Sequence, residues 1–223
     1  VKSADGSFGF VEKLWATRRI GEIIDQIDLH GKNAELVKEL VDLSTKHGIL
    51  TPYTSFLADE NSGIRSLAVH ERLEQTRSNL DSLSIAEGRA GVAQRASKGG
   101  FQNATNAPAP AAGGLGGGVY RDIQSDREVR LSGIKQLNNE TVYSRRLAET
   151  EAGKKGKQIL VTPETAQMDL EKDKAQIKTI ERFSDEYFAL IRANTVAENQ
   201  LLSLQEADDE LLVKFRGQAY LVK

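Results

Sequence analysis

Residues 8–60, FGFVEKLWATRRIGEIIDQIDLHGKNAELVKELVDLSTKHGILTPYTSFLADE, carry the strongest structural signals in the chain. They predict two helices joined by a short loop, followed by an extended segment. Asn33 is placed to cap the second helix, residues 33–47, and Gly48 suits the left-handed position that ends it. Residues 49–58 are rich in β-branched and aromatic side chains, which favours a strand, and Pro52 restricts that strand to a sheet edge, a strand start or a bulge.

The first helix, predicted over residues 10–29, has apolar residues on two opposite faces. At about 100° per residue, one face holds Val11, Leu14 and Trp15, and the other holds four isoleucines: Ile20, Ile23, Ile24 and Ile27. A helix on the surface of one domain keeps a single stripe. Two stripes indicate either contact with two bodies or burial on all sides in one core. The residues that we expect at an interface are Leu14, Trp15, Ile23, Ile24, Ile27, Tyr53 and Phe56.

The middle of the chain changes composition twice. Residues 61–95 have helical propensity, many charges and a weak apolar pattern, which fits a polar helical segment or partial disorder. Residues 96–118, ASKGGFQNATNAPAPAAGGLGGG, are of low complexity and predict a flexible linker. That linker would separate residues 1–60 and the polar segment from a small α+β unit over residues 119–223.

The carboxyl-terminal part alternates strand and helix signals. EVRLSGIKQL (128–137) and ETVYSRRL (140–147) predict strands around an Asn138-Asn139 turn, and residues 157–162 and 175–183 predict two more. Ser184 caps one short helix, and Thr195 with Glu198 forms a capping box for the next. The last residues predict a hairpin that turns at Arg216-Gly217. Together with the helical hairpin, these signals predict the α+β class.

Composition excludes several function classes. The 223 residues carry a formal net charge of −2, which gives no bulk electrostatic case for binding nucleic acid. No apolar run reaches the roughly 18 residues that a membrane-spanning segment needs. Cysteine is absent, which excludes disulfides, zinc–thiolate sites and thiol catalysis. Because the chain begins at Val1, we expect an internal or processed start.

No segment has the spacing of a catalytic or metal site. His70-Glu71-Arg72-Leu73-Glu74 lacks the second histidine of a metalloprotease helix, and the glycines of residues 113–118 do not match a phosphate-binding loop. The acidic residues 206–210 lack the pattern of a calcium loop. The basic residues between Arg145 and Lys157 are interrupted by glutamates. We therefore expect a non-enzymatic protein without cofactor, metal site or catalytic residues.

Four segments resemble one family. FVEKLWATRRIGEII, LVKELVDLSTKHGILTPYTSFL, RFSDEYFALIRAN and VKFRGQAYLVK are similar to the region that follows the von Willebrand factor A domain in proteins that also carry a VIT domain. Bacterial relatives of the inter-alpha-trypsin inhibitor heavy chains belong to this family. The pair Leu14-Trp15, the pair Leu43-Ser44 and residues 51–55 carry the match. The metal-binding Asp-x-Ser-x-Ser motif of such A domains does not occur here, so no metal residue is carried over.

The resemblance implies an interaction role. Its upstream partners would be the VIT and von Willebrand A domains of the same protein, with residues 10–47 held between them and the strand 49–58 joined to their sheet. We expect a scaffold or adhesion region of a secreted or cell-envelope bacterial protein, with a further protein partner or a homo-oligomer as possible contacts. The alternative is a proteolytically matured subunit that stays bound to its amino-terminal half.

Overall fold

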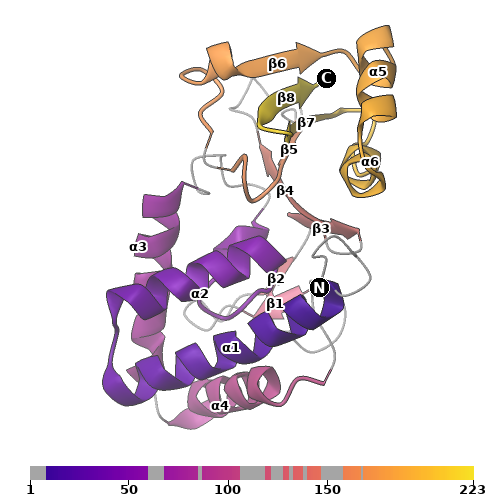
Figure 1. Ribbon diagram of the computed structural model, residues 1–223. Helices are drawn as coiled ribbons and strands as arrows, with labels where there is room; N and C mark the ends of the chain where they lie inside the picture. The colour runs from indigo at the N-terminus through magenta and orange to yellow at the C-terminus, as the bar shows by residue number, and fades with distance from the viewer. Residues whose placement is uncertain are drawn as a thin grey trace. The chain divides into compact units, whose positions relative to one another are not determined.

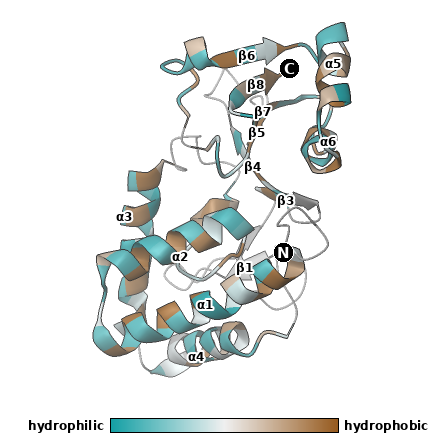
Figure 2. Ribbon diagram, in the orientation of Figure 1, coloured by the Kyte–Doolittle hydropathy of each residue, from teal (hydrophilic) through white to brown (hydrophobic). Residues whose placement is uncertain are grey.

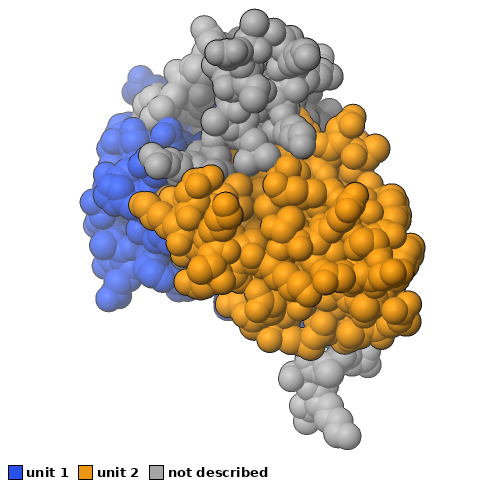
Figure 3. Space-filling model, turned by 90° about the horizontal axis from the view of Figure 1, so that it is seen from above, with its two compact units in different colours: residues 1–59, 69–131 blue, residues 60–68, 132–223 orange. Residues whose placement is uncertain are grey.

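A computed structural model describes residues 9–59, 68–84, 87–105, 119–121, 128–130, 133–137, 140–146, 158–166 and 168–223. The chain divides into two compact units, which Figure 3 colours separately. Unit 1 comprises residues 1–59 and 69–131, and unit 2 comprises residues 60–68 and 132–223. Helices predominate in unit 1 and strands in unit 2 (Figure 1), which confirms the α+β class.

Unit 1 is built on four α-helices: α1 (Gly9–His30), α2 (Ala34–His47), α3 (Val69–Asn79) and α4 (Gly88–Gln102). Two 3₁₀ turns, η2 (Ser55–Ala58) and η4 (Leu80–Ser84), connect them, and β1 (Val119–Arg121) pairs antiparallel with β2 (Glu128–Arg130). The core joins the isoleucine face of α1 to α2 and α4. Its buried members are Ala16, Ile20, Ile23, Ile24, Ile27, Val37, Leu40, Ile49, Tyr53, Leu80 and Phe101.

The helix signals of α2 are confirmed at both ends. The Asn33 side chain accepts a hydrogen bond from the Glu35 N–H, and Gly48 has φ 61° with its N–H bonded to Ser44 O. Residues 69–79 and 88–95 are helical, as predicted for the polar segment 61–95; residues 60–67 and 85–86 lie outside the described part. Arg72 and Thr76 of α3 are buried, so one side of this helix packs against the protein.

The predicted strand over residues 49–58 is wrong. Residues 52–54 form a turn, and residues 55–58 form the 3₁₀ turn η2. Thr51 and Thr54 cause the bend: Thr54 N–H donates to Thr51 O at 3.1 Å, and Thr51 N–H donates to Thr54 Oγ1 at 3.0 Å. Threonine hydroxyls offer the backbone partners that a strand would otherwise supply, and Pro52 is pre-set for a turn.

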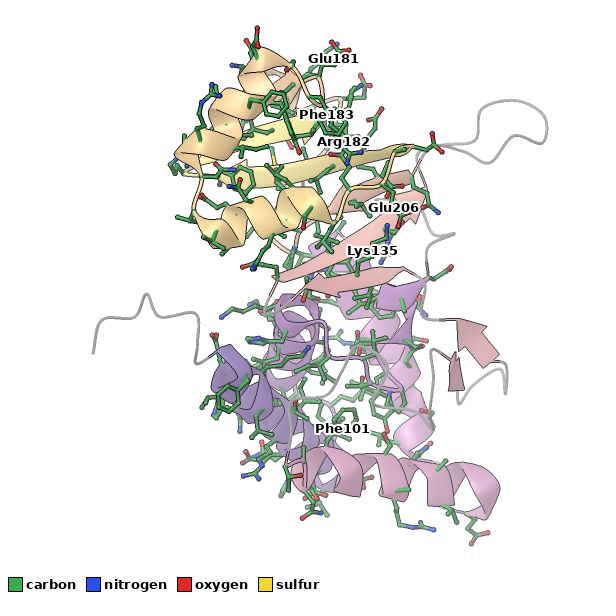
Figure 4. The ribbon with its side chains drawn as sticks, turned by 90° about the vertical axis from the view of Figure 1, so that its right-hand side faces the viewer. Phe101, Lys135, Glu181, Arg182, Phe183 and Glu206 are labelled. Carbon is green, nitrogen blue, oxygen red and sulfur yellow. The ribbon has the colours of Figure 1, made fainter. Side chains whose placement is uncertain are left out.

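The flexible linker predicted over residues 96–118 does not begin at residue 96. Helix α4 continues through residues 96–102, and Phe101 is 5% exposed within the core of unit 1 (Figure 4). A single aromatic anchor supplies the burial that the small residues around it lack. Residues 106–118, the rest of that segment, lie outside the described part. Residues 119–131 group with unit 1, whereas the prediction placed them in the carboxyl-terminal unit.

Unit 2 contains a six-stranded mixed sheet in the order β3-β4-β5-β7-β8-β6. The strands are β3 (Ile134–Leu137), β4 (Glu140–Arg146), β5 (Gln158–Val161), β6 (Ile177–Ile180), β7 (Asp209–Phe215) and β8 (Gln218–Val222). β5 runs parallel to β7 and β6 parallel to β8, and the other pairs are antiparallel. The remaining elements are η5 (Lys174–Gln176), α5 (Asp185–Ala193) and α6 (Val196–Ser203). Tyr187, Leu190, Leu201 and Leu202 pack these two helices into the sheet's core.

Several local predictions in unit 2 are confirmed. The Ser184 hydroxyl caps α5 and the Thr195–Glu198 capping box begins α6. β7 and β8 form the hairpin around Arg216-Gly217, and both turn residues have positive φ. The single strand predicted for residues 128–137 is instead two strands, because β2 pairs with β1 while β3 pairs with β4. The predicted turn residues 138–139 lie outside the described part.

Candidate interaction surface

The amino-terminal half of α1 exposes a contiguous apolar face. Phe10, Val11 and Trp15 are 58%, 49% and 55% exposed, and Leu14 is half-buried between them. We call these four residues the α1 apolar face. Apolar segments of α1 are visible near its amino-terminal end in Figure 2. Farther along, the isoleucine face is buried, so the alternative in which α1 is buried on all sides does not hold.

The seven predicted interface residues lie in three different places. Ile23, Ile24, Ile27 and Tyr53 lie in the core of unit 1, where they are at most 3% exposed. Burial also raises the pKa of the Tyr53 hydroxyl. Leu14 and Trp15 lie together on the α1 apolar face, whereas Phe56 is half-buried in η2. The structure therefore brings two of the seven residues together at the surface.

A shallow hollow accompanies the α1 apolar face. It has a volume of about 350 Å³ and is lined by Val11, Leu14, Trp15, Arg18, Arg19 and Glu22. These residues follow one another at the three- and four-residue spacing of one helix face. Phe10 and the two arginines are not among the predicted interface residues, although the same spacing, extended in both directions from Leu14 and Trp15, identifies them.

The two arginines have different roles. Arg19 binds both oxygens of Glu39 on α2 at 2.7 and 2.8 Å and approaches Glu22 at 3.1 Å. These hydrogen bonds raise the pKa of Arg19, and the bond from Arg19 lowers the pKa of Glu39. Arg18 Nε donates to Ala104 O beyond the end of α4 at 2.9 Å, and the Arg18 side chain is exposed. Arg19 thus fixes α1 against α2, while Arg18 leaves positive charge beside Trp15.

A second charged group lies where α1 meets the end of α2. Lys46 donates to Glu12 at 2.7 Å, and this hydrogen bond lowers the pKa of Glu12. His47 Nε2 lies 3.9 Å from the same carboxylate. Burial is the main cause that lowers the pKa of His47, and burial also lowers that of Lys13. These groups fix the helix packing next to the α1 apolar face.

The α1 apolar face contains residue types that are common at protein interfaces. Tryptophan and arginine at the centre of an apolar patch are the residue types that dominate protein interfaces. Across the described ranges, no group of three or more His, Asp or Glu is placed to hold a metal ion. No described helix has both the length and the hydropathy to cross a membrane. Comparison with known protein families, curated proteins and solved structures gave no match, and the family resemblance stays a prediction.

Proposed function

We propose that this chain is a non-catalytic protein-interaction region and that the α1 apolar face is its docking surface. One observation carries the proposal: the helix that buries four isoleucines in its own core exposes Phe10, Val11 and Trp15 on its other face. Large contiguous apolar patches on soluble proteins commonly mark interaction sites. A single exposed apolar residue needs no such explanation. Here three exposed apolar residues lie close together on the first turns of one helix, next to Arg18, and this grouping favours an interaction site.

The occupant that we propose is an A-type or VIT domain of the same protein, as the family resemblance implies. Residues 10–15 and the loop residues 51–55 both belong to the segments that carry this resemblance. In the structure, Tyr53 lies in the core and Trp15 on the surface. Tyr53 therefore holds the helical unit together, while Trp15 is free to enter a neighbouring domain. The upstream sheet is no longer expected to receive a strand from residues 49–58, because these residues form turns.

Site-directed photo-cross-linking in the natural protein tests this proposal. The photoreactive p-benzoylphenylalanine is placed at Trp15, and after irradiation the cross-linked peptides are identified by mass spectrometry. We expect cross-links from position 15 to a polypeptide segment outside residues 1–223. Leu29 is the matched control, because it is 69% exposed on the same helix but lies outside the α1 apolar face. Cross-linker at Leu29 should give no such product.

The products also separate the two forms of the proposal. A cross-link within one continuous chain supports docking of an upstream domain, whereas a cross-link to a separate polypeptide supports the matured subunit that stays bound to its amino-terminal half. Equal products from positions 15 and 29, or products confined to residues 1–223, would overturn the assignment of the α1 apolar face.

A further inference from the structure

A phenylalanine occupies a glycine-type position in unit 2. Ser184 N–H donates to Glu181 O at 3.2 Å and closes a turn between β6 and α5. Phe183 is the third residue of this turn and has φ 65°. Turns with positive φ at the third position favour glycine or asparagine there, because a Cβ atom crowds the backbone. Keeping phenylalanine in this place costs backbone free energy.

Burial does not account for this phenylalanine. At Arg216, the other described non-glycine residue with positive φ, the side chain donates to Ala193 O at 2.8 Å and to Asn194 Oδ1 at 3.1 Å. Those bonds tie the last hairpin to the segment between α5 and α6. The Phe183 side chain instead is 63% exposed. A strained residue whose side chain points to solvent indicates a role outside the fold.

The surroundings hold the Phe183 ring in a fixed place. The Arg182 guanidinium lies 4.7 Å from the ring centroid, and Figure 4 shows the two side chains next to each other. Arg182 is itself held, since its Nη1 donates to Glu206 O at 3.1 Å and its N–H donates to Lys223 O at 2.8 Å. A docking group that is already ordered loses little conformational entropy on binding.

Three aromatic rings form a row along the start of α5. Tyr187 meets Phe183 edge to face at 5.8 Å, and Phe188 meets Tyr187 in the same way at 5.8 Å. Tyr187 is buried, whereas Phe188 is 43% exposed. The row therefore presents two rings to solvent with a buried ring between them.

The unpaired acidic side chains of this row flank Phe183. Glu181 and Asp185 are exposed, and neither has an ion-pair partner in the described part of the chain. Glu186 is paired with Lys178 at 3.4 Å. Arg182 is the one cation beside Phe183, and the exposed Arg192 lies four residues after Phe188 on α5, so the acidic excess is confined to the Phe183 end of the row. Aromatic faces attract guanidinium and ammonium groups, and the position of Arg182 shows that the Phe183 ring accepts one.

We propose that Phe183 and Phe188 form a docking surface for a basic polypeptide segment. Lysine or arginine side chains of that segment pack their aliphatic stems and cationic groups on the exposed rings and pair with Glu181 and Asp185. The surface is independent of the α1 apolar face, because it lies in the other unit and selects a charged partner.

Binding of a basic peptide probe tests the proposal. Fluorescently labelled octa-arginine is titrated with the intact chain, and fluorescence anisotropy is recorded at low and moderate salt. We expect saturable binding that Phe183→Gly weakens about two- to fivefold, the loss of one cation–aromatic contact at an exposed site. Because glycine suits the turn, thermal unfolding of Phe183→Gly should occur at or above the wild-type temperature, so lost binding cannot come from unfolding. Glu181→Gln should weaken binding several-fold.

The control variant is Val196→Ala, which removes an exposed apolar side chain at the start of α6 and should bind like the wild type. Octa-glutamate is the control probe and should not bind. The proposal is overturned if the wild type does not bind octa-arginine, or if Phe183→Gly binds it as tightly as the wild type. The second outcome would mean that acidic residues attract octa-arginine and that the Phe183 ring has no role in binding.

Discussion

Gly21 lies in the middle of α1, where glycine costs about 1 kcal/mol of helix stability relative to alanine. Its neighbours explain why it is there. A Cβ atom at position 21 would lie 2.8 Å from Gln102 N and 2.9 Å from Phe101 Cβ on α4. Glycine therefore lets the two helices approach closely enough for Phe101 to reach the core.

Gly21→Ala should destabilise unit 1 by about 1–3 kcal/mol, as over-packing of a core does. One of the crowding atoms belongs to the backbone of α4, so a side-chain rotation cannot relieve the contact. Urea unfolding followed by circular dichroism measures the change. Gly99→Ala is the matched control, because nothing lies within 4 Å of its Cβ position and its helix should gain about 0.5–1 kcal/mol. A Gly21→Ala variant as stable as Gly99→Ala would contradict the proposed close approach.

His47 should make stability depend on pH below neutrality. Burial holds the pKa of folded His47 below the ordinary histidine value of 6.5, and in the unfolded chain the pKa returns to that ordinary value. As the pH falls through about 6.5, the unfolded state binds the proton first, so the free energy of unfolding decreases until the folded pKa is reached. Glu12, Lys13 and Lys46 act on the same imidazole, and burial outweighs the opposing effect of Glu12.

Replacing this histidine tests the linkage. His47→Gln should lose less stability than the wild type between pH 7 and pH 5, because the variant has no imidazole to protonate on unfolding. Urea unfolding at a series of pH values gives both slopes. Identical slopes would show that His47 is not the group responsible.

Two short segments, one in each unit, bend the chain with the same Thr-Pro-x-Thr pattern. In residues 51–54 the two threonine hydroxyls lie 2.9 Å apart, and in residues 162–165 they lie 3.0 Å apart. In both segments the first threonine's N–H donates to the last threonine's hydroxyl. All four threonines are buried. The pattern is a local turn device that ends one element and directs the chain into the next.

Thr165→Val should cost about 1–3 kcal/mol, although valine has almost the same shape. The Thr165 hydroxyl donates to Leu212 O at 2.7 Å and accepts from Thr162 N–H at 2.9 Å, so valine removes one hydrogen bond from each of these two backbone groups, which belong to buried residues. Chemical denaturation of both forms measures the loss. Thr179→Val, on the exposed face of the edge strand β6, should change stability by less than about 0.5 kcal/mol. Equal effects at both positions would refute the role of the hydroxyl.

These elements show what could be predicted from sequence. Caps at Asn33, Ser184 and Thr195 act within one turn of helix, so local pattern identified α2, α5 and α6 correctly. The strand predicted over residues 49–58 failed because composition does not show that threonine hydroxyls replace the ladder bonds. α4 was missed beyond residue 95 because Phe101 depends on Gly21, 80 positions away in sequence. For the candidate surface, helical periodicity found the exposed face containing Leu14 and Trp15, but it could not tell which of two apolar faces would be buried.

At the scale of the whole molecule, the two units have separate hydrophobic cores. The core of unit 1 draws on α1, α2, α4 and the turns between them, and that of unit 2 draws on the sheet with α5 and α6. Each unit carries one of the two proposed surfaces. The α1 apolar face belongs to unit 1, and the surface formed by Phe183 and Phe188 belongs to unit 2. A substitution in one core can therefore destabilise that unit while every residue of both surfaces stays unchanged.

Core substitutions should act on one unit at a time. Leu40→Ala in unit 1 and Leu211→Ala in unit 2 each remove a fully buried side chain, which should cost about 2–5 kcal/mol in the unit concerned. Hydrogen exchange read by mass spectrometry reports each unit separately through its own peptides. We expect Leu40→Ala to speed exchange in peptides of α1, α2 and α4 and to leave those of β7 and β8 unchanged, with the reverse for Leu211→Ala. If either variant speeds exchange equally throughout the described residues, the chain unfolds as one cooperative body, and the two surfaces must then be treated as parts of one module.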